Sequence, residues 1–154
     1  MRNFRNVMYR HVLIGVDGSP VALKAALHGL NFAKSISAMA TAIIVTPTWD
    51  AIALSEIVQG HFQDEYDART EEYAERCLGK VRSIAMERRV ACETIHVTAA
   101  RPFEAILSTA AQNACDLIVV GSHGRQGMER LLLGSETVKL LTHSKIPVLV
   151  YREK

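Results

Sequence analysis

The sequence predicts an α/β fold with an open, five-stranded parallel sheet and helices on both faces, of the Rossmann-like type. Three observations support this prediction. Short apolar runs alternate with segments of helical spacing along the chain, which is typical of parallel strands joined by crossover helices. The apolar runs show no in-out alternation, as expected for strands that are buried on both faces. The length of 154 residues suits one domain of this kind.

The first strand is predicted at residues 11–16, where an apolar run precedes Asp-Gly-Ser-Pro. Ser19 and Pro20 then begin a helix that continues to about Ala33. A serine hydroxyl caps the first turn of a helix, and proline suits the first helical position. The local sequence therefore predicts both the turn after the strand and the start of the helix.

The second strand is predicted at residues 41–46, which are rich in β-branched residues and stop before Pro47. Residues 50–65 are the least regular stretch of the chain. A long helix is predicted over about residues 65–89, because apolar residues mark one face and charged residues cover the rest.

The last part of the chain predicts two more helices and three more strands. Apolar and β-branched runs predict the strands, and a proline or serine near the first turn marks the start of each helix. In chain order, these elements are a strand at 91–98, a helix from Pro102 to about Ala110, a strand at 117–120, a helix that begins near residues 134–135, and a strand at 147–151.

Composition excludes several classes of protein. The chain is 49% hydrophobic and 22% charged, which is ordinary for a globular protein. It has no apolar run of about 18 residues, so no membrane span is expected. A net charge of +2 and an aromatic content of 6% argue against a nucleic-acid partner. Three widely spaced cysteines, Cys77, Cys92 and Cys115, favour reduced thiols in the cytoplasm.

The domain organisation is expected to be simple. Residues 1–8 contain no apolar segment of a secretory signal. We expect them to form an N-terminal arm, either disordered or the product of an over-long start. Residues 9–154 are expected to form a single domain.

A glycine-rich loop after the fourth strand carries the strongest functional signal. Two residues separate Gly121 from Gly124, and nine separate Gly124 from Gly134, where a helix begins. Phosphate binding needs backbone N–H groups that face the anion without an intervening Cβ atom. A helix N-terminus adds further N–H groups and a positive dipole end. We therefore predict a phosphate-binding loop, with Ser135 and Thr137 as hydroxyl donors.

The position of this loop in the predicted sheet supports a ligand site. Ligands of open parallel sheets bind beyond the carboxyl ends of the strands, where the strand order reverses. Unusual loops follow two of the strands, at residues 15–19 and 121–124, and we expect them to be neighbours at the switch point. We expect a side chain at Gly124 to be excluded by a positive φ and by the space that a phosphate needs.

The alternative is that these glycines serve only as turn residues. The loop is not a P-loop, because no Gly-Lys-Ser or Gly-Lys-Thr follows it, and it does not match the GxGxxG dinucleotide fingerprint. The glycine spacing by itself therefore leaves the phosphate-binding and turn interpretations open.

Together with its surroundings, the loop resembles the universal stress protein family. Gly-x2-Gly-x9-Gly-Ser after an apolar strand is similar to the ATP-binding signature of that family. The resemblance includes Val-Leu-Ile-Gly-Val-Asp-Gly-Ser at the first strand, Asp-Leu-Ile-Val-Val-Gly-Ser-His-Gly from Asp116, Leu-Leu-Leu-Gly-Ser, and Pro-Val-Leu-Val from Pro147. It covers residues 9–152 and implies a sheet that holds ATP at the switch point.

The resemblance also implies which residues contact the nucleotide. Asp17, with Gly15 beside it, would meet the ribose and adenine, and the backbone of Val45 would read the adenine edge. The residues that would line the ribose and phosphates are Val120, Gly121, Gly124, Gly134, Ser135, Glu136 and Thr137. The expected ligand is ATP, or AMP or ADP, with Mg or Mn.

Two of these residues have a second interpretation. Asp17 lies in Asp-Gly-Ser-Pro, where its side chain suits a turn or a cap on the following helix. Glu136 departs from the small or apolar residue usual in the family. A carboxylate at a helix start is favourable to the helix dipole, but it repels a terminal phosphate unless a metal ion lies between them.

The favoured function is that of a cytoplasmic ATP-binding protein of stress response or signalling, in which the nucleotide acts as a regulator. The loop lacks an evident general base, a P-loop lysine and paired metal-binding carboxylates, so phosphoryl transfer is not favoured. The alternatives are a slow ATP-hydrolysing enzyme and a nucleotide-free dimeric scaffold. We also expect a homodimer through the strand at 147–151, because an apolar edge strand invites pairing with a second copy and the family resemblance points to such a dimer.

Overall fold

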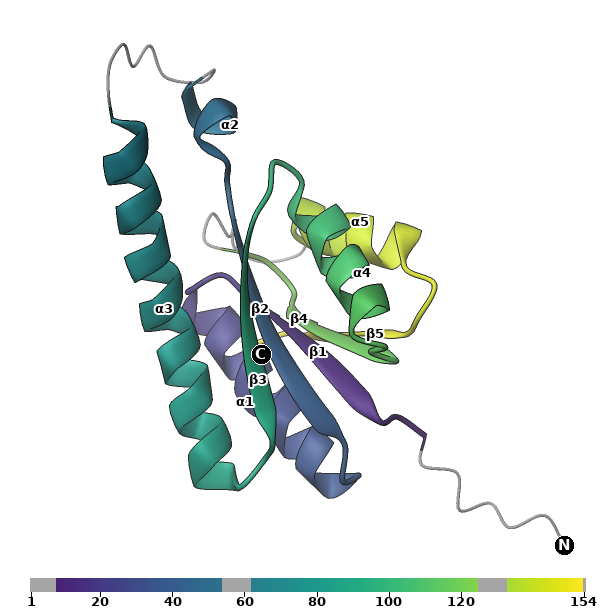
Figure 1. Cartoon of the computed structure of the whole chain (residues 1–154). Coiled ribbons are helices and arrows are strands. Elements are labelled where there is room, and N and C mark those ends of the chain that lie inside the picture. The colour runs from purple at the N-terminus through teal and green to yellow at the C-terminus, as the bar shows by residue number, and fades with distance from the viewer. Residues whose placement is uncertain (1–7, 54–61, 125–132, 154) are drawn as a thin grey trace, which may run out of the picture.

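The computed structural model describes residues 8–53, 62–124 and 133–153. They form one all-parallel sheet in the order β3-β2-β1-β4-β5, with helices on both faces (Figure 1). The predicted fold class is confirmed. Each strand begins and ends within two residues of its predicted position. The strands are β1 (His11–Val16), β2 (Met39–Thr46), β3 (Cys92–Thr98), β4 (Leu117–Gly121) and β5 (Val148–Tyr151).

Within the described residues, five helices accompany the strands. They are α1 (Pro20–Ser35), α2 (Trp49–Ala53), α3 (Gln63–Arg88), α4 (Pro102–Gln112) and α5 (Ser135–His143). The short α2 overlaps residues 50–65, which the sequence marks as least regular. It has no periodic apolar face from which a helix could be predicted. Of the N-terminal arm expected at residues 1–8, all but Met8 lies outside the described residues.

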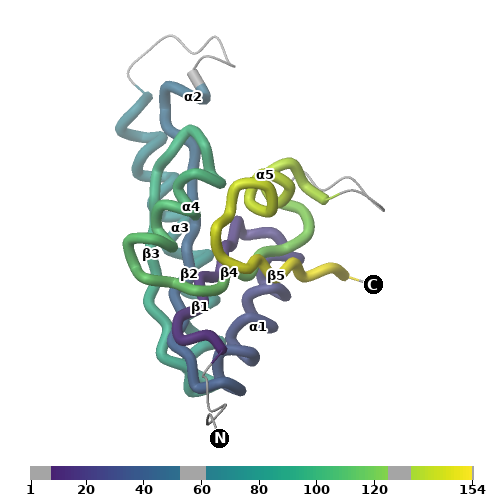
Figure 2. Tube along the Cα trace, turned by 90° about the vertical axis from the view of Figure 1, so that its right-hand side faces the viewer, coloured from purple at the N-terminus to yellow at the C-terminus, as the bar shows by residue number. Residues whose placement is uncertain are grey.

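The helices form two layers. In Figures 1 and 2, α1 and α3 cover one face of the sheet, and α4 and α5 cover the other. Each layer encloses its own apolar core. The first core includes Ile14, Leu30 and Val81, and the second includes Ile43, Ile118 and Leu140. Both faces of the central strands are therefore buried, which explains their unbroken apolar sequence.

The start of α1 agrees with the sequence. Ser19 is the N-cap residue, and its hydroxyl accepts a hydrogen bond of 3.1 Å from the N–H of Ala22. Pro20 is the first helical residue. The predicted cap residue Ser19 and the predicted first helical residue Pro20 therefore begin α1 just after β1.

The switch point lies between β1 and β4. From β1 the chain proceeds to β2 and β3 on one side, and it returns to β4 and β5 on the other. The register pairs Val16 with Ile44 and Ile14 with Val119, so the carboxyl ends of these strands lie along one edge of the sheet. The loops after β1 and β4 are therefore neighbours, as predicted. None of the helices in the described part of the chain is long and apolar enough to cross a membrane.

Candidate functional site

The candidate site lies where β1, β2 and β4 end and α5 begins. The fold brings together all four segments that carry the predicted nucleotide-binding residues, although they are far apart in the sequence. The middle of the glycine loop, residues 125–132, lies outside the described residues. The site is therefore described from its two ends and from the neighbouring loop after β1.

The loops after β1 and β4 meet at Asp17 and Gly124. An ideal Cβ atom on Gly124 would lie 2.6 Å from Oδ2 of Asp17, which is too close for any real contact. Gly124 thus allows the backbone of the glycine loop to approach the carboxylate. The expectation of a positive φ at Gly124 is wrong, because Gly18 is the glycine with that conformation in the described chain, at φ 84°. Close approach, rather than backbone conformation, excludes a side chain at Gly124.

The carboxylate of Asp17 has a defined orientation. Its Oδ1 accepts a hydrogen bond of 2.9 Å from the N–H of Ser19 and closes the turn, while Oδ2 lies on the Gly124 side. The backbone carbonyl of Asp17 accepts a hydrogen bond of 2.7 Å from the hydroxyl of Tyr73. The predicted turn role of Asp17 is therefore confirmed, but the N-cap of α1 is Ser19. The Oδ2 atom of this carboxylate is directed toward Gly124.

The two outer glycines of the loop pack against the protein. A Cβ atom on Gly121 would lie 3.0 Å from Cγ1 of Val21, and one on Gly134 would lie 3.1 Å from Cα of His123. The N–H of Gly134 also donates to the carbonyl of Ser122 at 2.7 Å. The contacts of Gly121 join the end of β4 to α1, and those of Gly134 bring the start of α5 against the residues that follow β4. Turn and packing roles therefore account for part of the glycine pattern.

The first turn of α5 faces the end of β4. Gly134 is the N-cap residue and has no side chain to cap the N–H groups of the first turn, which are the groups that bind anions at helix N-termini. The buried hydroxyl of Thr137 donates to the carbonyl of Gly121 at 3.0 Å. This hydrogen bond links α5 to β4. Ser135, in contrast, is exposed to solvent.

Glu136 points to a neighbouring helix. Its Oε2 accepts a hydrogen bond of 3.0 Å from the N–H of Phe103 in the first turn of α4, and its Oε1 lies 2.8 Å from Nζ of Lys139. Arg101, the N-cap residue of α4, makes no side-chain capping bond, so Glu136 supplies the cap from another helix. Sequence reasoning missed this role because the contact spans 33 residues.

Three more of the predicted residues are part of the sheet. Val45 lies near the end of β2, is partly buried and pairs with Val97 of β3. Gly15 and Val120 lie on neighbouring strands, and a Cβ atom on Gly15 would lie 3.0 Å from Cγ1 of Val120. The side chain of Val120 is buried in the core, and its backbone pairs with Val150 of β5.

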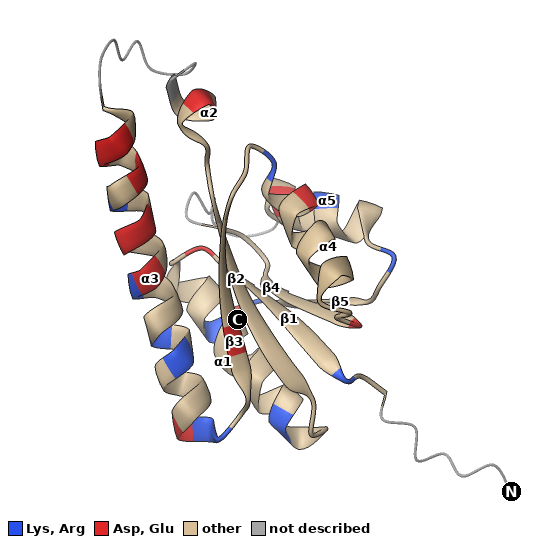
Figure 3. Ribbon diagram, viewed as in Figure 1, with Lys and Arg blue, Asp and Glu red and all other residues tan. Residues whose placement is uncertain are grey.

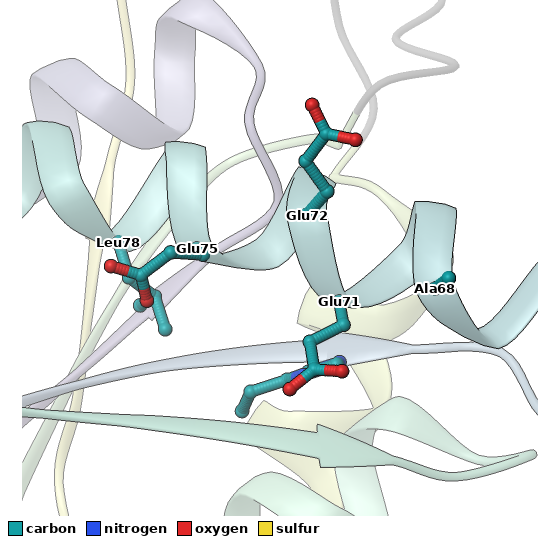
Figure 4. A pocket seen from close by; sticks show the side chains of 6 residues that line it. Ala68, Glu71, Glu72, Glu75 and Leu78 are labelled. Atoms are coloured by element: carbon teal, nitrogen blue, oxygen red, sulfur yellow. The ribbon is translucent and has the colours of Figure 1, made fainter.

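A hollow of about 450 Å³ lies elsewhere, between α3 and β3. In Figure 4, Glu71 and Glu75 point toward the strands, whereas Glu72 points away from them. The surrounding amino-terminal half of α3 is strongly acidic (Figure 3). Carboxylates repel phosphates, so this hollow does not suit a nucleotide. Its lining residues are Ala68, Glu71, Glu72, Glu75, Leu78 and His96.

Metal binding and thiol chemistry have little support in the described parts of the chain. These parts contain no group of three or more His, Cys, Asp or Glu side chains that would hold a metal ion. Burial raises the pKa of the Cys92 thiol, and burial together with the charge of Asp116 raises that of Cys115 to about 11. Both thiols are protonated at neutral pH and are poor nucleophiles.

Comparisons with known proteins give relatives along the whole chain. The model of the universal stress protein family matches residues 8–152. The universal stress protein MJ0531 of Methanocaldococcus jannaschii is 33% identical over 153 residues, which are 99% of this chain and 87% of that protein. The universal stress protein YxiE of Bacillus subtilis is 30% identical over 152 residues, which are 94% of this chain and 100% of that protein.

Solved structures share the same fold. Protein MJ0577 superposes with a TM-score of 0.78 at 24% identity and covers 96% of this chain and 98% of its own. A universal stress protein in complex with cAMP has a TM-score of 0.66 at 21% identity, with 95% and 98% covered. A universal stress protein of Archaeoglobus fulgidus in complex with dAMP has a TM-score of 0.59 at 16% identity, with 92% and 97% covered. The family match, the curated relatives and the shared fold agree with the sequence motifs: this chain belongs to the universal stress protein family.

Proposed function

We propose that this stress-response protein binds an adenine nucleotide, with ATP as the expected ligand, and that the nucleotide regulates the protein. The site is the switch point between β1 and β4, within a single domain formed by residues 9–154. The observation that carries the proposal is the approach of Gly124 to the carboxylate of Asp17 beside the N-terminus of α5. A glycine without a Cβ atom, a directed carboxylate and a helix start provide donors for phosphates and an acceptor for ribose hydroxyls.

Each predicted residue has a place in this proposal. Asp17 and Gly15 would lie on the ribose and adenine side, and the backbone of Val45 would face the adenine edge. Backbone groups at Val120 and at the three loop glycines would line the ribose and phosphates. At the start of α5, the hydroxyl of Ser135 and the N–H groups of Ser135, Glu136 and Thr137 would complete the phosphate side.

The comparisons support adenine nucleotides as the class of ligand. Two of the structural neighbours are complexes with cAMP and dAMP. Both have the adenine base and one phosphate in common, although their identity to this chain is too low to transfer a ligand by itself. In this proposal ATP binds with Mg or Mn, and AMP and ADP compete for the same site.

A regulatory role fits the site better than turnover. Phosphoryl transfer needs positioned cations and a group that orients the nucleophile. Of the two carboxylates at the described site, Asp17 faces the glycine loop and Glu136 is engaged with α4 and Lys139. An assay for ADP release tests this point, since turnover above that of a Gly124→Val protein would favour the slow ATP-hydrolysing alternative.

The experiment for nucleotide binding is calorimetry with ATP and Mg²⁺ on the wild type and on Gly124→Val. We expect the variant to fold but to lose measurable binding, because its side chain occupies the space beside Asp17 that the ligand needs. Gly79→Val is the matched control, since Gly79 lies in α3 and a Cβ atom there meets only the end of the Arg82 side chain, at 3.7 Å. Unchanged affinity in a folded Gly124→Val protein would remove this site, and absence of binding in the wild type would favour the scaffold alternative.

Two further parts of the proposal concern the surroundings of the protein. We propose a cytoplasmic location, which is supported by the free thiols of Cys77, Cys92 and Cys115; recovery of the native protein in an oxidising compartment by cell fractionation would contradict it. We also propose a homodimer through β5, an edge strand of the sheet. The test of the dimer depends on the whole sheet and is argued in the Discussion.

A further inference from the structure

Tyr73 joins the long helix α3 to the candidate nucleotide site. Its hydroxyl donates a hydrogen bond of 2.7 Å to the backbone carbonyl of Asp17, a residue 56 positions earlier in the chain. The side chain is partly buried, and it packs against the first apolar core. The guanidinium of Arg76 lies 5.8 Å from the centre of its ring. In the sequence, Tyr73 stands out only as one residue of the apolar face of a helix.

The contact extends to the residue after Asp17. Gly18 has a φ of 84°, which residues with a side chain rarely adopt. A Cβ atom on Gly18 would lie 2.9 Å from Cζ of Tyr73 and 2.9 Å from Sγ of Cys77, and closer still to the tyrosine hydroxyl. The turn after β1 therefore lies directly against α3, and Gly18 is the residue that makes this approach possible.

The contacts that fix the position of Asp17 include the following. Tyr73 holds its carbonyl, the N–H of Ser19 holds Oδ1, and Oδ2 lies beside Gly124. Only the first of these contacts comes from outside the two loops of the site. Without the hydrogen bond from Tyr73, the peptide group between Asp17 and Gly18 is held less firmly, and the carboxylate samples more orientations.

We propose that Tyr73 is a positioning residue of the nucleotide site, which sets the orientation of the Asp17 carboxylate toward the glycine loop. The proposal rests on the nucleotide-binding function argued above. A binding group that is held in its bound orientation before the ligand arrives costs less conformational entropy on binding. Tyr73 thus raises nucleotide affinity without contacting the nucleotide, and it makes the start of α1 and the middle of α3 parts of one site.

The test uses Tyr73→Phe, which keeps the ring packing and removes only the hydroxyl. Tyr66→Phe is the matched control, because the hydroxyl of Tyr66, on the same helix, donates to the carbonyl of Pro47 at 2.9 Å. Two quantities are measured: the affinity for ATP by calorimetry, and the rate of amide hydrogen exchange at Ser19 without nucleotide. The exchange rate reports on the turn itself and does not depend on nucleotide binding.

We expect Tyr73→Phe to weaken ATP binding about fivefold, which corresponds to the roughly 1 kcal/mol of one hydrogen bond. It should also speed amide exchange at Ser19, while Tyr66→Phe leaves both quantities unchanged. Wild-type affinity in Tyr73→Phe would overturn the proposal. So would an equal loss in both variants, since that would indicate a general loosening of α3. If the wild type binds no nucleotide, the proposed function fails instead, and the exchange at Ser19 still decides whether Tyr73 orders the turn.

Discussion

Asp17, Gly18 and Ser19 are three neighbours that meet three different requirements. The carboxylate of Asp17 closes the turn and faces the glycine loop, Gly18 lies against α3 with a positive φ, and Ser19 caps α1. Turn and capping signals act within a few residues, so the roles of Asp17 in the turn and of Ser19 were predictable from the sequence. The contact of Gly18 with α3 was not, because the local pattern contains no information about a helix that begins 45 residues later.

At the same scale, Cys115 predicts a pH dependence of stability. The residue is 6% exposed, and burial together with the charge of Asp116 raises the pKa of the thiol to about 11, from a usual value of 9.0. The unfolded chain loses this proton near pH 9, whereas the folded protein keeps it to about pH 11. The contribution to the free energy of unfolding is therefore complete below pH 9 and is lost as the pH rises through 11.

We expect the wild type to lose about 2 kcal/mol of stability, relative to Cys115→Ala, between pH 9 and 11. Urea unfolding of both proteins at several pH values measures this difference, and the subtraction removes the titration of the lysines and tyrosines. A constant difference between the two proteins across this range would show that the thiol has no raised pKa.

A carboxylate of helix α5 hydrogen-bonds to the first turn of helix α4. Glu136 caps the first turn of α4 by accepting the N–H of Phe103, which has no cap from its own segment. Glu136→Ala should lower the free energy of unfolding by about 1 kcal/mol, the usual cost of a lost cap. Glu136→Gln should recover most of it, because the amide oxygen still accepts the hydrogen bond. Thermal or urea unfolding measures both values, and equal losses in the two variants would contradict the capping role.

The same pair of variants tests the concern that Glu136 repels a terminal phosphate. The carboxylate points to α4 and pairs with Lys139, so we expect Glu136→Gln to bind ATP and AMP with wild-type affinity. A selective gain for ATP in calorimetry would mean that the charge acts on the phosphates after all. This outcome would restore a preference for shorter nucleotides in the wild type.

Elements with their own periodicity were predictable, and contacts between distant elements were not. The five strands and four longer helices carry apolar runs or caps that can be read within about ten residues of sequence. Helix α2 has only five residues and no such pattern. Likewise, the loops after β1 and β4 were expected to be neighbours from topology alone. The approach of Gly124 to Asp17, the cap from Glu136 and the bond from Tyr73 depend on how whole elements pack.

The whole sheet has two edges, and they differ in chemistry. Strand β3 is bounded by the charged surface of α3 and presents the exposed carboxylate of Glu93. Strand β5, in contrast, consists of four residues without charge, Val148–Tyr151, and Leu149 is exposed on it. Val138 and Leu141 on the adjacent α5 are exposed as well. Charged side chains protect edge strands from pairing, and apolar ones do not, so β5 is the edge suited to a second copy.

The register of β5 shows which backbone groups a partner would use. The N–H of Ile118 donates to the carbonyl of Pro147, and the N–H of Ser122 donates to the carbonyl of Tyr151. Because backbone directions alternate along a strand, Val148 and Val150 point their N–H and carbonyl groups away from β4. Two copies paired antiparallel about a two-fold axis would form a continuous ten-stranded sheet through these groups, with Pro147 limiting the pairing at one end.

Val150→Pro removes an outward N–H from the middle of this edge, so we expect a folded monomer in place of a dimer. Thr94→Pro is the matched control. The N–H of Ala40 donates to the carbonyl of Ala91, so the same alternation directs the N–H of Thr94 outward on the opposite edge strand. Its dimer should be intact. Sedimentation at micromolar concentration measures the assembly, and circular dichroism checks the fold.

A wild-type monomer would contradict the proposed dimer, as would a dimer that survives in folded Val150→Pro. If Thr94→Pro alone became monomeric, the pairing edge would be β3, and its charged surface would not have prevented association.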